Sequence, residues 1–204
     1  MLNRSIAAFS LILMLICCKS QPKINPDFLA DITAYRAEQI ENLSLTDASP
    51  LSTAAVKNLS FYEPDETFRV IATVEKLKPK ESITIDTYSG IEKEFIEYAK
   101  LTFSVKGKAF ILITHKNLKS MRMPQYRNKM FLMFTDMTTG VSTYGGGRYI
   151  YIDESELVDG MIPLDFNKAF NPYCAYSDGF NCPIPPREND LAIKIEAGEK
   201  DFNK

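Results

Sequence analysis

The spacing of apolar and polar residues divides the chain into an N-terminal helical part and a longer β-rich part. Asp27 is placed as a helix N-cap, and apolar residues recur near helical spacing after it. Ser49-Pro50 gives a second start signal, with proline at the first helical position. The pattern therefore predicts a helix over residues 27–42 and a short helix over residues 51–59.

Beyond residue 60 the apolar period changes to two, which is typical of strands. Lys106-Gly107-Lys108 predicts a tight turn between two of these strands, and the run M-F-L-M-F at 130–134 predicts a central strand. The expected strands cover residues 67–76, 82–87, 92–105, 109–115, 129–136, 149–152, 161–166 and 191–195.

Most connections between these strands are too short to carry a crossover helix, so the sheet should be mainly antiparallel. We expect a mainly β fold, either an antiparallel β-sandwich or an open barrel, with one or two N-terminal helices packed on it.

The amino-acid composition limits the classes of molecule that could be partners of this protein. Of 204 residues, 24 are Lys or Arg and 26 are Asp or Glu, and the two signs are interspersed. No basic stripe supports a nucleic acid partner. Thirteen Phe and ten Tyr supply bulky core residues in the absence of Trp.

The N-terminus indicates export. Asn3-Arg4 precedes an apolar run over residues 6–16, which is too short to span a bilayer as a stable helix. The run ends in L-I-C-C, which resembles the lipobox of bacterial lipoproteins. Cys18 is the expected lipidation site. Cys17 is the alternative, because the residue before the acceptor is usually Gly, Ala or Ser and here it is Cys17. An uncleaved N-terminal anchor or an ordinary signal peptide is the other interpretation of this segment.

These features predict a lipoprotein signal peptide over residues 1–17, a tether over residues 18–27 and a single β-rich domain over residues 28–204. The protein is then expected in the bacterial cell envelope, facing the periplasm or the exterior. Acyl chains such as palmitate would hold it on the membrane, where stable anchoring takes at least two chains.

The residue types and motifs that the sequence lacks restrict the reactions and metal sites that it could support. His115 is the only histidine, so a His-rich metal site is excluded, and no G-x-S-x-G, P-loop or G-x-G-x-x-G motif occurs. We expect neither a metal nor a cofactor.

Cys174 and Cys182 are close in sequence. In an exported chain such a pair more often forms a disulfide, which here would close a loop of about nine residues. Free thiols are the main alternative, and a metal or redox site is the remaining one.

A glycine-rich segment, T-Y-G-G-G-R-Y, is the first candidate ligand site. Its glycines, with Gly146 in the centre, permit close backbone approach, and Tyr144 flanks them. Arg148 can grip a carboxylate or phosphate through two hydrogen bonds. The alternative is a structural turn in which Arg148 pairs with Asp136 or Asp165.

The proline-rich segment from Leu164 to Gly198 is the second candidate, because proline stiffens it without regular structure. Its candidate ligand-binding residues are Asp165, Asn167, Asn171 and Tyr173. Asparagines in such loops also commonly bond backbone groups instead of a ligand.

Several motifs together resemble an uncharacterised bacterial and archaeal family, domain-of-unknown-function family 1684 (DUF1684), of which this chain looks like a lipoprotein-type member. They are F-T-D-M-T-T-G, T-Y-G-G-G-R-Y-I, L-D-F-N-K-A-F-N-P-Y-C-A-Y, C-P-I-P-P-R-E-N and I-E-A-G-E. The resemblance covers about residues 28–199. Phe170 replaces a common tyrosine, and Tyr173 replaces a common second proline.

The resemblance implies no known activity. Because similar proteins also occur without export signals, it favours free thiols somewhat more than the spacing alone does. Residues that match the family pattern are Asp165, Phe166, Asn167, Asn171, Pro172, Cys174, Ala175, Cys182, Pro183, Pro185, Pro186, Glu188 and Asn189.

Our leading functional hypothesis is a lipid-anchored binding domain that holds a small polar ligand or a short peptide where the Gly-Arg turn meets the Cys/Pro-rich loop, which is part of the Leu164–Gly198 segment. Asp136, Arg148 and residues 165–171 would hold the ligand. An envelope protein is the other possible partner. One alternative is a hydrolase with Asp136 or Asp165 as acid or base and Arg148 as the electrophilic stabiliser. A purely structural envelope module is the third reading.

Overall fold

The computed structural model describes residues 26–44, 49–78 and 81–202. The proposed signal peptide, both N-terminal cysteines and most of the tether lie outside these residues. The first helix, α1, covers Pro26–Asn42 and confirms the predicted helix to within one residue. It buries Phe28 and Ile32 against the rest of the domain. None of the helices in the described residues is long and apolar enough to cross a membrane.

The second predicted helix, over residues 51–59, is wrong. Only a short 3₁₀ turn, η1 (Val56–Asn58), forms there. The Leu51 N–H donates to the Leu43 carbonyl, and the Ser52 hydroxyl accepts from the Ala55 N–H. The backbone is therefore held by these contacts and not by a continuous helical ladder.

The eight predicted strands are all present, with shifted ends. Their bounds are β1 Arg69–Lys76, β2 Ile83–Ile85, β3 Lys93–Val105, β4 Lys108–Asn117, β5 Lys129–Asp136, β6 Arg148–Asp153, β7 Met161–Asp165 and β8 Asp190–Leu191. The short helical segments are α2 Pro124–Arg127, η2 Glu66–Phe68, η3 Ser120–Arg122, η4 Glu154–Glu156, η5 Phe166–Lys168, η6 Tyr173–Ala175 and η7 Arg187–Asn189.

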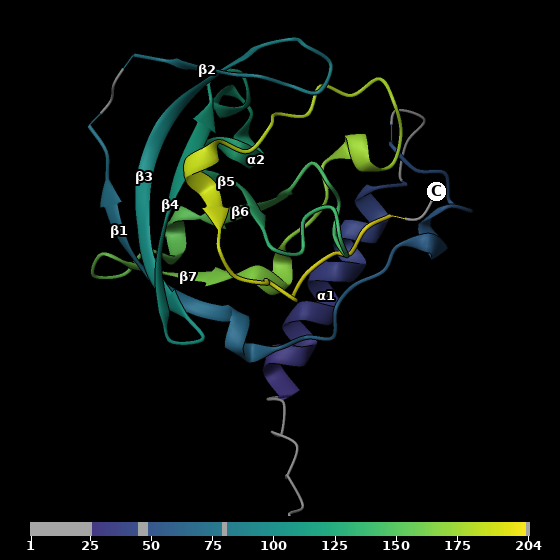
Figure 1. The fold of residues 1–204 in the computed structure, drawn as a ribbon, viewed down its shortest axis with the longest axis horizontal. Helices are drawn as coiled ribbons and strands as arrows, with labels where there is room; N and C mark the ends of the chain where they lie inside the picture. Colours follow the sequence, from purple (N-terminus) through teal and green to yellow (C-terminus); the bar gives the residue numbers. More distant parts are fainter. Residues whose placement is uncertain (1–25, 45–48, 79–80, 203–204) are drawn as a thin grey trace, which may run out of the picture.

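The strands form one curled, mainly antiparallel sheet in the order β6-β5-β4-β3-β1-β7, with β2 added to β3 and β8 pairing parallel to β5. The sheet bends into a half-barrel, visible in the long curved β3 and β4 (Figure 1). This confirms the predicted fold class, in its open-barrel form. The β3–β4 hairpin turns at Lys106 and Gly107, which both have positive φ, as a two-residue loop requires.

The pairing between β4 and β5 is limited to His115 and Phe131. Beyond that point Asn189 fills the gap between the two strands. Its side chain bonds both backbone groups of Ile113 and donates to the Met133 carbonyl at 2.8 Å. The two halves of the sheet thus remain joined although their backbones diverge.

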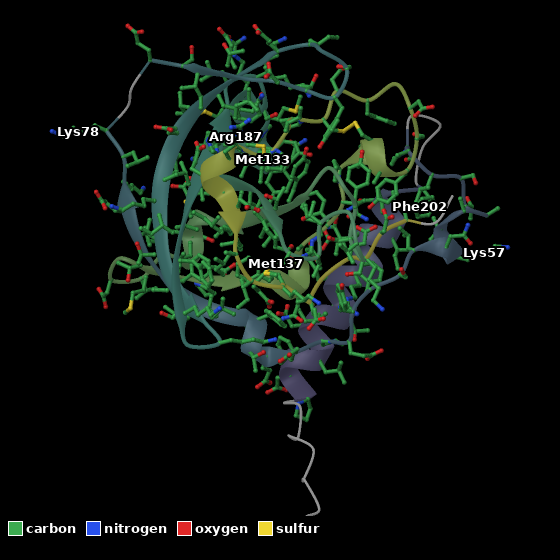
Figure 2. All side chains as sticks on the ribbon, in the orientation of Figure 1. Lys57, Lys78, Met133, Met137, Arg187 and Phe202 are labelled. Atoms are coloured by element: carbon green, nitrogen blue, oxygen red, sulfur yellow. A yellow bond between two sulfur atoms is a disulfide. The ribbon has the colours of Figure 1, made fainter. Side chains whose placement is uncertain are left out.

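Alternation along β5 and β6 gives this part of the sheet two buried faces. Met130, Leu132 and Phe134 belong to the main core inside the half-barrel, while Phe131 and Met133 belong to a separate cluster on the opposite face. Figure 2 shows Met133 in the interior, whereas Lys57 and Lys78 lie at the periphery. The second face is the one that positions the candidate site.

Candidate functional site

A large cavity lies between the second face of β5 and β6, helix α1 and the Cys/Pro-rich loop. Its volume is about 940 Å³. Strands provide one side through Phe131, Tyr149 and Tyr151, and α1 provides another through Tyr35 and Gln39. The loop closes a third side with residues 170–173 and 180–183. Segments far apart in the sequence therefore enclose one space.

The strand side of the cavity is a continuous aromatic surface. The Phe131 and Tyr151 rings stack with centroids 5.0 Å apart, and Tyr151 stacks on Phe170 at 5.7 Å. Phe95 extends the stack beyond Phe131 at 6.2 Å. We call these four rings the aromatic wall. Tyr149 packs edge-on against Phe131 at 4.9 Å, which holds the wall in place.

Glu199 contributes a carboxyl to the cavity lining although its residue is only 2% exposed. The Asn171 N–H donates to this carboxyl at 2.9 Å, and the Tyr176 hydroxyl donates to both of its oxygens. Burial outweighs these bonds and raises the pKa of Glu199 to about 7. The carboxyl is therefore a proton donor or acceptor near neutral pH.

Asn171 also lines the cavity, and only one of the two polar groups of its side chain forms a hydrogen bond. Its amide nitrogen donates to the Lys200 carbonyl at 2.8 Å. Its Oδ1, although buried, has no hydrogen-bond partner among the described residues. An unused buried acceptor beside Glu199 makes this end of the cavity polar. We call Asn171, Tyr176 and Glu199 the polar floor.

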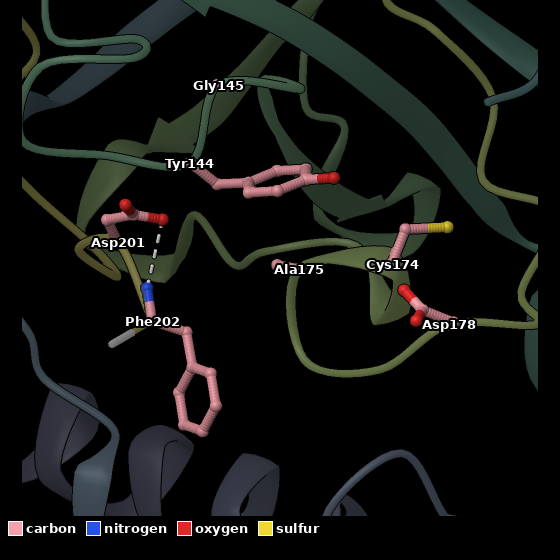
Figure 3. A pocket seen from close by; sticks show the side chains of 7 residues that line it. All are labelled: Tyr144, Gly145, Cys174, Ala175, Asp178, Asp201 and Phe202. Atoms are coloured by element: carbon pink, nitrogen blue, oxygen red, sulfur yellow. Dashed lines mark hydrogen bonds between the residues drawn. The ribbon is translucent and has the colours of Figure 1, made fainter. Parts of the chain in front are cut away.

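The glycine-rich turn and the Cys/Pro-rich loop do lie together, at a shallower pocket of about 630 Å³ (Figure 3). Its lining comprises Tyr144, Gly145, Cys174, Ala175, Asp178, Asp201 and Phe202. A side chain at position 146 would collide with the Tyr144 ring, so Gly146 is what allows that ring to cover the turn. This pocket is open. Two carboxylates line it, Asp178 and Asp201, and the Asp201 carboxylate accepts from the Phe202 N–H at 3.1 Å.

Arg148 is fully buried and faces the backbone of residues 195–199. Its guanidinium donates to the carbonyls of Ile195 and Ala197 and to Asp136 at 2.8 Å. The Asp136 carboxyl also accepts from the Thr138 N–H and is itself fully buried. This is the structural pairing that the sequence left open as an alternative.

Asp165 and Asn167 form a second structural bracket. The Asp165 carboxyl accepts from the Asn167 backbone and side chain, and Asn167 bonds both backbone groups of Asp65. Burial raises the pKa of Asp165, against the opposing effect of Arg69 nearby.

Of the eight predicted binding residues, Asn171 and Tyr173 line the large cavity, Tyr144 lines the shallow pocket, and Gly146 supports Tyr144. The other four, Asp136, Arg148, Asp165 and Asn167, line neither space. A role of these four residues in ligand binding stays a prediction, and their positions away from both spaces do not favour it.

Cys174 and Cys182 form a disulfide, with Cα atoms 6.2 Å apart. The predicted disulfide is therefore present, and its first cysteine directly follows Tyr173. Cys182 lines the large cavity and Cys174 the shallow pocket, so one bond braces both.

Metal and histidine chemistry find no site within the described ranges. No group of three or more His, Cys, Asp or Glu is placed there to hold a metal ion. His115 is completely buried, neither ring nitrogen has a partner in the same ranges, and burial lowers its pKa. It packs edge-on against Phe95.

The sequence analysis missed Glu199 and the aromatic wall as site components. Glu199 stands in the motif I-E-A-G-E, which carried the family resemblance, and that was the available signal. The wall residues come from four separate segments: Phe95 from β3, Phe131 from β5, Tyr151 from β6 and Phe170 from the loop after η5. Alternation along one strand does not reveal which residues of other segments will stack on it.

Comparison with known proteins agrees with this fold. The chain resembles an uncharacterized protein of Haloarcula marismortui solved by solution NMR, at 34% identity and a TM-score of 0.67. The match covers 85% of this chain and 94% of that one. Among curated proteins, no match to the sequence is found. The model of a family described as "Protein of unknown function (DUF1684)" matches residues 54–200, so the chain belongs to the DUF1684 family.

Proposed function

We propose that this protein is an exported, lipid-anchored binding protein that holds a small aromatic ligand in the large cavity. The observation that carries the proposal is the solvent-accessible cavity of about 940 Å³ lined by the aromatic wall and the polar floor. Sites for small molecules are typically concave, mostly apolar, 300–1,000 Å³ in size and equipped with a few placed polar groups.

Two aromatic side chains at the cavity are only partly covered by the protein. Tyr151 is 42% exposed and Tyr173 is 41% exposed, although Tyr151 lies in the central part of β6 and Tyr173 directly precedes the disulfide-bonded Cys174. The exposed ring surfaces are accessible to water. A flat apolar ligand would displace that water and stack on rings that are already ordered, so little conformational entropy is lost on binding.

The polar floor supplies orientation. The Oδ1 of Asn171 is a buried acceptor without a partner among the described residues, and a ligand N–H or O–H that reached it after a small side-chain shift would satisfy it. The Glu199 carboxyl, protonated below about pH 7, adds a group able to donate or accept. A ligand with an aromatic body and one polar donor fits both ends of the space.

The proposed location of the protein on a membrane surface rests on its N-terminal sequence. The basic start, the apolar run and the L-I-C-C sequence support export and lipidation at Cys18, with Cys17 as the alternative. The membrane would then be a partner through the lipid, and the domain would face the periplasm or the exterior.

Thermal unfolding of the full chain with 2-naphthamide, a neutral aromatic probe, tests the proposal. Ligand that binds only the folded state raises the Tm. We expect a concentration-dependent rise for the wild type and a smaller rise for Tyr151→Ala.

The matched control is Ile71→Ala. Ile71 is also an exposed apolar residue, at 60%, but it lies on β1 and does not line the cavity. It should respond to the probe as the wild type does. Equal responses of Tyr151→Ala and the wild type, or no rise at any concentration, contradict the proposal.

A hydrolase that uses Asp136 or Asp165 gains no support from the geometry, because neither carboxylate lines the cavity. A purely structural module predicts no probe response, so the same experiment separates it from a binding protein.

A further inference from the structure

The charges along the cavity narrow the class of ligand. Four lysines line it, and three have a carboxylate partner. Lys116 pairs with Glu154, Lys129 with Asp153, and Lys168 with Asp31. The positive charge of each of these lysines is therefore balanced by a nearby carboxylate, and the fourth lysine is the exception.

The exception is Lys93. Its ammonium donates to the Asn181 carbonyl, and no carboxylate of the described ranges lies within ion-pairing distance. The residue is half-buried. An ammonium group has three N–H donors, so a lysine bonded only to a carbonyl oxygen retains donors for an anion.

The pKa of Lys93 is lowered, first by burial and then by the like charge of Lys119. An anion bound to Lys93 would stabilise its charged form.

Lys93 is also positioned relative to the aromatic wall. It lies two residues before Phe95 on β3, so both side chains leave the same face of the strand. Both line the cavity, and Phe95 is the end of the stack that continues through Phe131 to Tyr151. A positive charge therefore stands at one end of a row of aromatic rings.

We infer that the ligand is an aromatic anion, whose ring packs on the aromatic wall while its carboxylate or similar acid group is bound by Lys93. This assignment rests on the proposed function, which supplies the cavity as a binding site. It adds a ligand charge and a specificity-determining residue that the aromatic wall does not imply.

The test compares two probes with the same ring system, anionic 2-naphthoate and neutral 2-naphthamide, by isothermal titration calorimetry of the full chain in detergent. We expect the wild type to bind the naphthoate about tenfold more tightly, as a charge-assisted hydrogen bond permits. Added NaCl should reduce this preference.

Variants assign the preference to Lys93. Lys93→Gln should bring the affinity ratio close to one while leaving naphthamide binding in place, and Lys93→Arg should keep the preference. The matched control is Lys108→Gln, which removes an exposed lysine outside the cavity and should leave the ratio unchanged.

The outcomes are distinguishable. If neither probe binds, the proposed function fails and the inference fails with it. If both bind equally to the wild type, the cavity binds ligands but the assigned charge is wrong. If Lys93→Gln weakens both probes and the tenfold ratio persists, Lys93 acts only by holding the Asn181 loop, and the inference is overturned.

Discussion

The hydroxyl of Tyr176 lies 2.7 and 2.8 Å from the two carboxyl oxygens of Glu199. The pair is buried between the sheet and the Cys/Pro-rich loop, with Arg148 near enough to oppose the effect of burial on the carboxyl. Burial dominates, and the pKa of Tyr176 is raised as well. The Tyr176 hydroxyl and the Glu199 carboxyl, 23 residues apart in the sequence, therefore form one buried hydrogen-bonded pair.

Glu199 should make stability depend on pH. The folded state keeps the carboxyl protonated up to about pH 7, whereas its ordinary pKa is 4.5. Between these values the unfolded chain binds fewer protons, so the free energy of unfolding falls as the pH rises. The expected loss is about 3 kcal/mol.

Glu199→Gln cannot ionise, so its stability relative to the wild type should increase between pH 4.5 and pH 7.5. Urea unfolding followed by circular dichroism at several pH values measures this difference. Glu75→Gln, at an exposed ion pair, is the control and should give a flat difference. A flat difference for Glu199→Gln would show that the carboxyl is ionised in the folded protein.

Arg148→Ala should destabilise the domain by about 3–5 kcal/mol, because it leaves the buried Asp136 carboxylate without its cation. Arg69→Ala should cost about 1 kcal/mol or less, because Arg69 is 39% exposed at its ion pairs. Urea denaturation compares the two. An Arg148→Ala protein of normal stability that no longer responds to 2-naphthamide would restore Arg148 as a ligand-binding residue.

Loss of the Cys174–Cys182 disulfide should cost about 2.5 kcal/mol, from the freedom regained by a loop of about nine residues in the unfolded chain. Thermal unfolding with and without dithiothreitol measures it. The double variant Cys174→Ser/Cys182→Ser should have the same Tm as the wild type with its disulfide reduced. Dithiothreitol should not change the Tm of this variant. If the reductant lowers the Tm of both proteins equally, the effect arises elsewhere.

Gly147→Ala should be more harmful than Gly160→Ala. Both glycines have positive φ, at +79° and +76°, so both substitutions carry a backbone penalty of about 1 kcal/mol. Only at Gly147 does the added Cβ meet other atoms, the Phe134 carbonyl and Pro185 Cγ, each at 2.7 Å. We expect about 2 kcal/mol of further loss there. Equal losses in urea would show that the turn can move away from Pro185.

Local pattern was enough to predict the strands and the β3–β4 hairpin, because period-two alternation and a Lys-Gly turn are short-range signals. It failed over residues 51–59, where Leu51 bonds back to Leu43 and the segment follows tertiary contacts instead of its cap signal. It also overextended the last strand, since β8 ends at Leu191. Two residues of pairing to β5 are all that the sheet accommodates there.

The candidate site was predicted in part. The glycine turn and the cysteine loop are adjacent, as expected, yet Arg148 bonds carbonyls of the C-terminal segment. Whether an arginine meets a ligand or a backbone depends on where residues 195–199 lie, and no local pattern contains that information. The cavity itself depends on α1 standing off the second face of β5 and β6, a spacing set by packing across distant parts of the chain.

The bonds from Arg148 to residues 195–199 have a consequence for biogenesis. During synthesis the Arg148 guanidinium can pair with Asp136, which precedes it, but the carbonyls of Ile195 and Ala197 follow nearly fifty residues later. Ile195 and Ala197 also complete the main core. We therefore expect the domain to close only after the chain has been made through residue 199, and a nascent chain that is still open is accessible to chaperones until then.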